Sequence, residues 1–144
     1  TYIQSEVERY ELYKKLFRAV NDEEIHAIVS EMRDRFGMLP PEALQLVEAV
    51  QLRITALPGG FSHVSFKGGK LTCEFPPEDR LAFYSSVFPA MMKAVAQMRE
   101  VQIIPKGKKV FIQSAVGSLE QAMVLLRHIV EATKQILLAE TREA

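Results

Sequence analysis

The spacing of the apolar residues changes abruptly near residue 60, and this change constrains the fold more than any other feature of the chain. Before Pro58-Gly59-Gly60, apolar residues recur every three or four positions, as on one face of a helix. After it they alternate, with Val64 and Phe66 on one face, and Leu71, Cys73 and Phe75 on another. Between the two alternating runs, Gly68-Gly69 suits a two-residue turn with positive φ at both positions. Helices therefore come first, followed by a β-hairpin.

Three helices are predicted before residue 58. Asn21 caps the second, with Glu24 three residues on in capping-box register, and Gly37 predicts a left-handed end. Pro40-Pro41 then begins the third helix, because proline at a first-turn position loses no helical hydrogen bond. The predicted apolar stripes are Val7, Tyr10, Tyr13, Leu16, Phe17 and Val20; then Ile25, Ile28, Val29, Met32 and Phe36; and then Ala43, Val47, Val50, Ile54 and Leu57.

The second half predicts a further helical region, a second hairpin and a last helix. Leu81, Tyr84 and Phe88 suit a short helix, and Pro89 starts another that runs to Met98, because proline argues against one uninterrupted helix. The second hairpin joins residues 101–104 to residues 110–112 through a turn at 105–109. The last helix begins at Ser118, capped with Gln121, and buries Leu119, Ala122, Leu126, Ile129, Val130, Thr133, Ile136 and Leu137.

The element order is thus ααα-ββ-α-ββ-α, which predicts an α+β fold. In it, N-terminal helices precede two β-hairpins that form a small antiparallel sheet packed with helices. A length of 144 residues suits a single domain, residues 1–144. Thr1 is not an initiator residue, so we expect the chain to derive from a longer protein.

The composition argues against several classes of protein. The chain has 18 basic and 18 acidic residues, so it lacks the basic footprint of a duplex-binding domain. Cys73 is the only cysteine and cannot form an internal disulfide, and no apolar run approaches the ~20 residues that span a bilayer. These features predict a soluble protein with a cytoplasmic location and no membrane contact.

No group of residues predicts an active site. His26, His63 and His128 fall in three separate elements without a second ligand at suitable spacing, which favours structural or solvated roles over a metal site. Cys73 shares a strand face with apolar residues, which favours a buried side chain over a nucleophile. Met91, Met92 and Met98 suit core filling better than an adaptable binding surface.

The glycine-containing turns do not form a nucleotide loop. Gly68-Gly69 lies between two strands, and residues 105–109 lack the earlier glycine and the following Ser or Thr of a Walker loop. We therefore predict no catalytic, cofactor-binding or metal-binding residues, and no enzymatic activity in this chain.

Residues 31–40 carry the most specific pattern, Glu31-Met32-Arg33-Asp34-Arg35-Phe36-Gly37-Met38-Leu39-Pro40. They resemble the Glu-x-x-Asp-Arg-Phe-Gly-x-Leu-Pro signature in the C-terminal domain of the bacterial transcription-repair coupling factor. Tyr2-Ile3, Arg9 and Tyr13-Lys14-Lys15-Leu16 resemble the opening of that domain, and Lys67-Gly68-Gly69 resembles its hairpin. The resemblance covers residues 2–76.

This resemblance implies an autoinhibitory regulatory domain. In the coupling factor, an acidic patch holds this domain against basic residues of the N-terminal module of the same chain. That module recruits the damage-recognition ATPase of nucleotide excision repair. Carried over residue by residue, Glu31 and Asp34 form the interdomain contact, with Arg35 as a possible third member. The parent would be an ATP-dependent DNA translocase that binds RNA polymerase and DNA through its other parts.

The same sequence also suits other roles. Glu31 and Arg35 also suit an ordinary solvated helix face, paired four residues apart. An independent nucleic-acid-binding module would use the tip from Lys106 to Lys109 together with Lys67 and Lys70. A small-molecule sensor would need an apolar pocket that sequence does not reveal.

Overall fold

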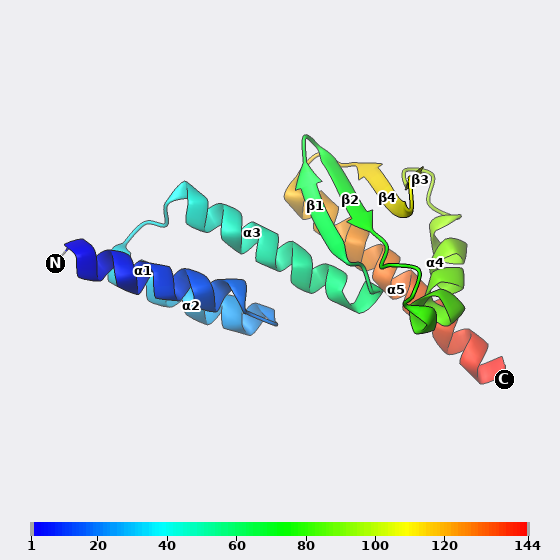
Figure 1. The fold of residues 1–144 in the computed structure, drawn as a ribbon, viewed down its shortest axis with the longest axis horizontal. Coiled ribbons are helices and arrows are strands. Elements are labelled where there is room, and N and C mark those ends of the chain that lie inside the picture. Colours follow the sequence, from blue (N-terminus) through cyan, green and yellow to red (C-terminus); the bar gives the residue numbers. More distant parts are fainter. Residues whose placement is uncertain (1, 144) are drawn as a thin grey trace. The chain divides into compact units, whose positions relative to one another are not determined.

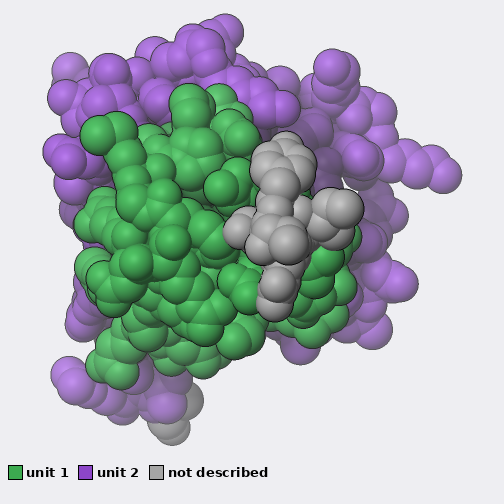
Figure 2. Space-filling model, turned by 90° about the vertical axis from the view of Figure 1, so that its left-hand side faces the viewer, with its two compact units in different colours: residues 1–54 green, residues 55–144 purple. Residues whose placement is uncertain are grey.

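The computed structural model describes the backbone of residues 2–143 and the side chains of residues 6–142, so the side chains of Tyr2 and Ile3 lie outside this range. The chain divides into two units, residues 1–54 and residues 55–144, which are coloured separately in Figure 2 and described separately below. The element order is ααα-ββ-α-ββ-α, which confirms the predicted α+β fold (Figure 1).

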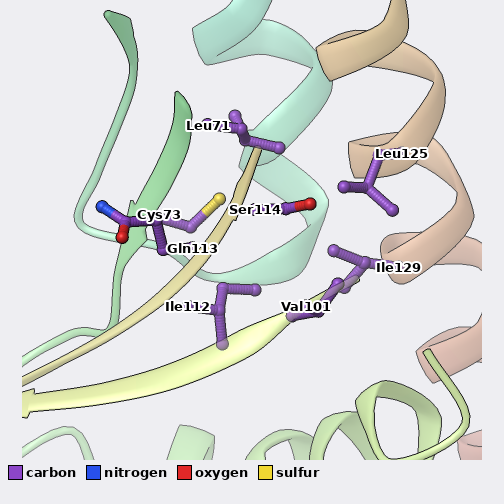
Figure 3. A pocket seen from close by; sticks show the side chains of 8 residues that line it. All are labelled: Leu71, Cys73, Val101, Ile112, Gln113, Ser114, Leu125 and Ile129. Atoms are coloured by element: carbon purple, nitrogen blue, oxygen red, sulfur yellow. The ribbon is translucent and has the colours of Figure 1, made fainter. Parts of the chain in front are cut away.

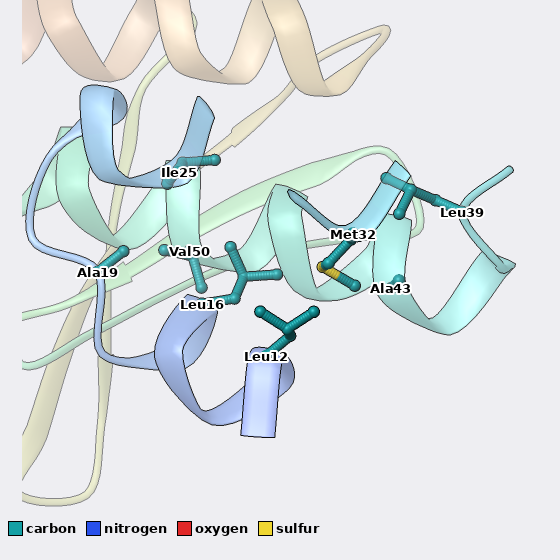
Figure 4. Close-up of a cluster of buried hydrophobic side chains, with 8 residues drawn as sticks. All are labelled: Leu12, Leu16, Ala19, Ile25, Met32, Leu39, Ala43 and Val50. Carbon is teal, nitrogen blue, oxygen red and sulfur yellow. The ribbon is translucent and has the colours of Figure 1, made fainter. Parts of the chain in front are cut away.

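Unit 1 is an α-helical unit with its own apolar core. It contains α1 (Tyr2–Phe17), α2 (Asp22–Phe36) and most of α3 (Pro41–Ala56). Side chains from all three helices and the two connecting segments meet in one cluster (Figure 4). The buried members of the cluster are Leu12, Leu16, Ala19, Ile25, Met32, Leu39, Ala43 and Val50.

The predicted stripe of α1 is largely wrong. Val7, Tyr10, Phe17 and Val20 are 57–64% exposed, whereas the parallel set Leu12, Leu16 and Ala19 is buried. Both sets recur at helical spacing, so periodicity alone does not choose between them. The buried set is wholly aliphatic, while the exposed rings of Tyr10 and Phe17 carry the cations of Lys14 and Arg53 at 4.8 and 5.3 Å from their centroids.

The stripes of α2 and α3 are confirmed except at one end. Ile25 and Met32 are buried, and Ile28, Val29 and Phe36 pack half-buried against the cluster. In α3, Ala43 and Val50 are buried, with Val47 and Ile54 packed beside them. Leu57 was expected to continue this stripe, but it is 64% exposed. The helix has ended by then, since Leu57–Gly59 form the 3₁₀ turn η1.

Both predicted capping boxes are present, each with a small shift. Asn21 Oδ1 accepts from Glu24 N at 2.8 Å, while Glu24 Oε2 accepts from Val20 N, one residue before the cap. Ser118 caps α5 (Leu119–Glu143) in the same way, with Gln121 Oε1 accepting from Gly117 N. Gly37 has the positive φ that was predicted, 81°, but its ψ of −138° lies outside the left-handed helical region.

Unit 2 is built on one four-stranded antiparallel sheet. Its strands are β1 (His63–Lys67), β2 (Lys70–Glu74), β3 (Gln102–Lys106) and β4 (Lys109–Ala115), in the spatial order β1-β2-β4-β3 (Figure 1). Gly68 and Gly69 have positive φ, as the first turn requires. The register pairs Val64 with Cys73 and Phe66 with Leu71, so the two apolar sets that were assigned to separate faces share one face.

Helix α5 covers that apolar face of the sheet. Leu125 and Ile129 of α5 point toward Leu71, Cys73 and Ile112 of the strands (Figure 3). All five side chains are buried. Because side chains alternate along a strand, covering one face leaves the other set pointing away from α5.

The expected break before Pro89 is absent. Helical structure runs from Leu81 through the π-turn η2 (Phe83–Val87) directly into α4 (Phe88–Val95). Pro89 lacks the N–H that an α-helix would use at this position, and a wider turn accommodates it without ending the helix. The helix also stops before Met98, which is buried in the following turn.

The burial of α2 makes a stability prediction. Met32 is 1% exposed, so Met32→Ala should lower the free energy of unfolding by about 2–5 kcal/mol. Phe36 is half-buried, so Phe36→Ala should cost less than the about 3–5 kcal/mol of a fully buried phenylalanine. Urea unfolding, with Val7→Ala as the exposed control, measures all three. A loss for Phe36→Ala as large as that for a buried phenylalanine would contradict the half-buried position.

Candidate interdomain surface

The C-terminal end of α2 presents a group of charges. Burial of Ile25 and Met32 turns Asp34 and Arg35 outward to solvent, with Glu31 half-buried beside them. We refer to Glu31, Asp34 and Arg35 as the α2-end patch. The sequence placed Glu31 and Asp34 on the solvent side, and Asp34 is the more exposed of the two.

Two members of the patch already form an ion pair. Arg35 Nη2 lies 3.1 Å from Glu31 Oε1, with side chains 49% and 36% exposed. Such exposed pairs four residues apart contribute only about 0.3–0.5 kcal/mol, so the pair does little to hold the helix. Asp34 forms no side-chain hydrogen bond or ion pair with the described residues. Its carboxylate is therefore the charge of the patch that is available to a partner.

Helix α1 adds a cation beside the patch. The Arg9 guanidinium lies over the ring of Phe36, 5.2 Å from its centroid, and Arg9 Nη1 also pairs with Glu6 Oε1 at 3.5 Å. Phe36 directly follows Arg35, so Arg9 reaches the end of α2 from a different helix. Sequence reasoning noted Arg9 as part of the resemblance but did not place it here. This contact depends on how α1 and α2 pack, which no local pattern specifies.

Met38 is the other residue that sequence reasoning missed. It follows Gly37 at the end of α2 and is 94% exposed, the most exposed of the large apolar side chains among the described residues. The family signature gives the one sequence indication of this exposure. Met38 lies between its glycine and its leucine, where no residue at helical spacing is buried. An apolar side chain thus stands in solvent just past the α2-end patch.

The lysines of the alternative nucleic-acid site do not form one cluster. Lys70 of β2 pairs with Ala115 of β4, whereas Glu74 pairs with Phe111. The two hairpin tips therefore lie at opposite ends of the sheet, with Lys67 and Lys70 at one end and the tip from Lys106 to Lys109 at the other. The tip alone is a small basic turn, exposed at every lysine.

One lysine of that tip is already paired. Lys109 Nζ lies 3.3 Å from Glu74 Oε1, and Ser62 Oγ donates to Glu74 Oε2 at 2.8 Å. The Ser62 hydrogen bond, with Lys109 beside it, lowers the pKa of the Glu74 carboxyl below its usual value. Glu74 therefore stays ionised and offsets part of the charge at this end of the sheet.

The residues considered for metal binding remain apart. His26, His63 and His128 are exposed on α2, β1 and α5. Across the described residues, no group of three His, Cys, Asp or Glu side chains is placed to hold a metal ion. Within the same range, no helix is long and apolar enough to cross a membrane.

Comparison with known proteins identifies the family. A family model described as the TRCF domain matches residues 1–86, more than half of the chain. The chain belongs to the TRCF family. Its similarity to curated relatives lies within about half of its length: it is 37% identical over 70 residues to a transcription-repair-coupling factor of Staphylococcus haemolyticus, and 38% identical over 64 residues to one of Mycobacterium bovis.

These relatives are much longer than this TRCF domain. The matched residues make up 49% and 44% of the chain but only 6% and 5% of the two coupling factors. A solved structure described as the C-terminal domain of transcription-repair coupling factor has a similar fold. It aligns with a TM-score of 0.58 and 20% identity, over 90% of this chain and 81% of that one. The fold similarity thus extends beyond the residues that the family model matches.

Cys73 of this TRCF domain is buried, as predicted. It lies in a small apolar gap between the sheet and α5, whose lining contains no histidine (Figure 3). Burial raises the pKa of its thiol to about 12. At neutral pH the group is therefore the protonated thiol, and no neighbour activates it.

The burial of Cys73 gives a pH prediction. The folded pKa of about 12 lies above the ordinary value of 9.0, so protonation of this thiol favours the folded state below pH 9. This contribution is lost as pH rises toward 12. A thiol reagent should therefore react slowly with the native chain between pH 7 and 9, and rapidly in denaturant. Fast native labelling at pH 8, measured by absorbance or mass, would contradict the buried position.

Proposed function

We propose that this TRCF domain regulates a larger coupling factor and does not itself catalyse a reaction. In the full-length protein it would dock on the N-terminal repair-recruitment module and cover the surface that recruits the damage-recognition ATPase of nucleotide excision repair. In the same closed state it would restrain the DNA translocase motor. RNA polymerase, DNA and ATP would bind to other parts of the parent.

The observation that supports this proposal best is the α2-end patch. Its charges lie within the family signature yet contribute little to the stability of α2, because they are exposed. Asp34 points to solvent without a partner among the described residues. A surface of this kind suits a contact with another part of the protein better than a role in the fold.

The chemistry of the patch fits a basic partner surface. An arginine or lysine of the N-terminal module can pair with Asp34 without breaking the contact between Arg35 and Glu31. Once paired with Asp34, this basic side chain would also lie close to Glu31, so both carboxylates would attract it. Because exposed Met38 stands just past the patch, an apolar contact beside the ion pairs would add buried area.

Such a contact is sufficient for autoinhibition. A ligand or partner shifts a conformational equilibrium only by its difference in affinity for the two states. The α2-end patch would be paired in the closed state and solvated in the open state. Engagement of the parent with RNA polymerase would then favour the open state and expose the recruitment surface.

The central prediction concerns reversal of the two acids. Glu31→Lys with Asp34→Lys should leave the melting temperature of the isolated domain nearly unchanged, because exposed pairs contribute about 0.2–1 kcal/mol. Across an interface, loss of a close charge pair costs about 2–5 kcal/mol, and each 1.4 kcal/mol is about tenfold. The repair ATPase should therefore bind the full-length variant at least about tenfold more tightly, as measured by titration at physiological salt.

A matched control isolates the position of the charges from their number. Glu48 and Glu131 are exposed acids in the middle of α3 and α5. Glu48→Lys with Glu131→Lys makes the same change in net charge and should leave recruitment unchanged. If the patch variant folds normally without a gain in affinity, Glu31 and Asp34 form an ordinary solvated face.

A deletion tests the regulatory role as a whole. Removing this domain from the full-length protein should raise the ATPase and translocation rates and strengthen binding of the repair ATPase, because a closed-state contact is lost. The isolated domain should show no ATP turnover. A motor rate that stays the same or falls in a well-folded deletion would argue against autoinhibition.

A further inference from the structure

The sheet of unit 2 has a second face that no helix of the unit covers. Cys73 and Ile112 point toward α5, so their strand neighbours Thr72, Glu74 and Gln113 point the other way. We call the side of the sheet away from α5 the open face. Every described side chain that the register places on it is exposed or half-buried.

Four lysines belong to the open face. Lys67 pairs with Lys70 at one end of the sheet, and Lys106 pairs with Lys109 at the other. The register puts all four on the same side as Thr72 and Gln113. Lys70 lies opposite Ala115, which is six residues from Lys109 along β4, so about 20 Å separates the two pairs. Positive charge therefore stands at both ends of the face.

The zero net charge of the whole chain does not reflect this local excess of positive charge. Residues 55–144 contain eleven Lys and Arg against eight Asp and Glu, whereas residues 1–54 contain seven against ten. The open face has a single acid, Glu74, which is already bonded to Ser62 and Lys109. The zero net charge of the chain therefore does not exclude a polyanion site on this face.

The middle of the open face is polar and partly apolar. The register aligns Ser65, Thr72, Gln113 and Gln102 in one row across the four strands, and Gln113 Nε2 donates to Thr72 Oγ1 at 3.1 Å. The adjacent row contains half-buried Phe111 and Ile104. An aromatic ring and amide groups are the features on which unstacked bases rest and pair.

We propose that the open face binds single-stranded nucleic acid. The two lysine pairs would contact backbone phosphates at either end, and the bases between them would lie over Phe111 and the central polar row. Lysine acts on phosphate as a point charge, so this contact would be largely independent of sequence. The proposal is separate from the α2-end patch and does not rest on the regulatory function.

A single strand fits this face better than a duplex or an acidic peptide. Duplex DNA is read by a helix or ribbon that enters a groove, whereas the open face is one side of a four-stranded sheet. An acidic peptide would satisfy the lysines but would leave the aromatic centre without bases to stack on it. A nucleic acid strand supplies both regularly spaced charges and flat rings.

The first measurement is binding of a fluorescent twenty-nucleotide oligo-dT to the 144-residue chain at several salt concentrations. The dissociation constant should fall in the range of about 10⁻⁴–10⁻⁶ M that is typical of sequence-independent binding. With four phosphate contacts, the slope of log K against log salt should be about −3. A single-stranded RNA of the same length should bind within a few fold.

Charge-reversal variants test which lysines carry the binding. Lys67→Glu with Lys70→Glu should weaken binding at least tenfold and reduce the salt slope by about 1.4, and Lys106→Glu should weaken it by a smaller factor. Arg127→Glu with Lys134→Glu makes the same change in charge on α5 and should shift the affinity by less than about threefold. Thermal melting of each variant shows that it remains folded.

Four outcomes would overturn the proposal. They are an absence of oligo-dT binding at 50 mM salt with millimolar protein, an equal loss in the α5 control, tighter binding to a duplex of the same length, and equal competition by an oligo-glutamate peptide. The last two would assign the face to a duplex or to acidic protein segments. None of them bears on recruitment of the repair ATPase, which the α2-end patch variants test separately.

Discussion

Burial of Met32 between α1 and α3 is the contact on which the position of the α2-end patch depends. The rotation of a helix about its own axis decides which of its residues face the core. Burial of Met32 and Ile25 in the core of unit 1 sets this rotation for α2. Asp34 and Arg35 then lie on the outward side, where the exposed ion pair of Arg35 with Glu31 contributes little to holding them. The position of the patch is thus set by apolar packing, while its charges are available for another purpose.

The same logic determines the open face of the sheet. Ile112 and Leu71 are held against Leu125 and Ile129 of α5, and strand alternation then directs the intervening residues away from the helix. A slip of one residue in register would bury lysines and expose the core. The lysines of the open face are therefore positioned by residues that never contact a ligand.

Local sequence patterns predicted the helices and strands. The features that depend on nonlocal packing could not be predicted from them. Asn21 and Ser118 cap helices through bonds to residues three positions away, so sequence spacing is sufficient to find them. The buried side of α1 was not predictable, because two stripes with the same period overlap and only contact with α2 and α3 selects one. The strand order β1-β2-β4-β3 pairs β2 with β4, whose paired residues lie 37 to 45 positions apart in the chain. This order places the two pairs of lysines at opposite ends of the sheet. The family signature supplied Glu31, Asp34 and Arg35 as proposed contact residues, whereas Arg9 reaches the end of α2 only through tertiary packing.

The two proposed surfaces differ in how they use charge. The α2-end patch lies in the acidic unit. It has one carboxylate, that of Asp34, without a partner among the described residues, and it lies beside an exposed methionine, which suits a specific contact that opens and closes. The open face lies in the basic unit and has its charges spread over a sheet, which suits a repeating polyanion of any sequence. The net negative charge of residues 1–54 and the net positive charge of residues 55–144 cancel in the chain as a whole. A zero net charge is therefore a sum over two units with separate surfaces, and only the placement of each charge on its element shows which partner it can meet.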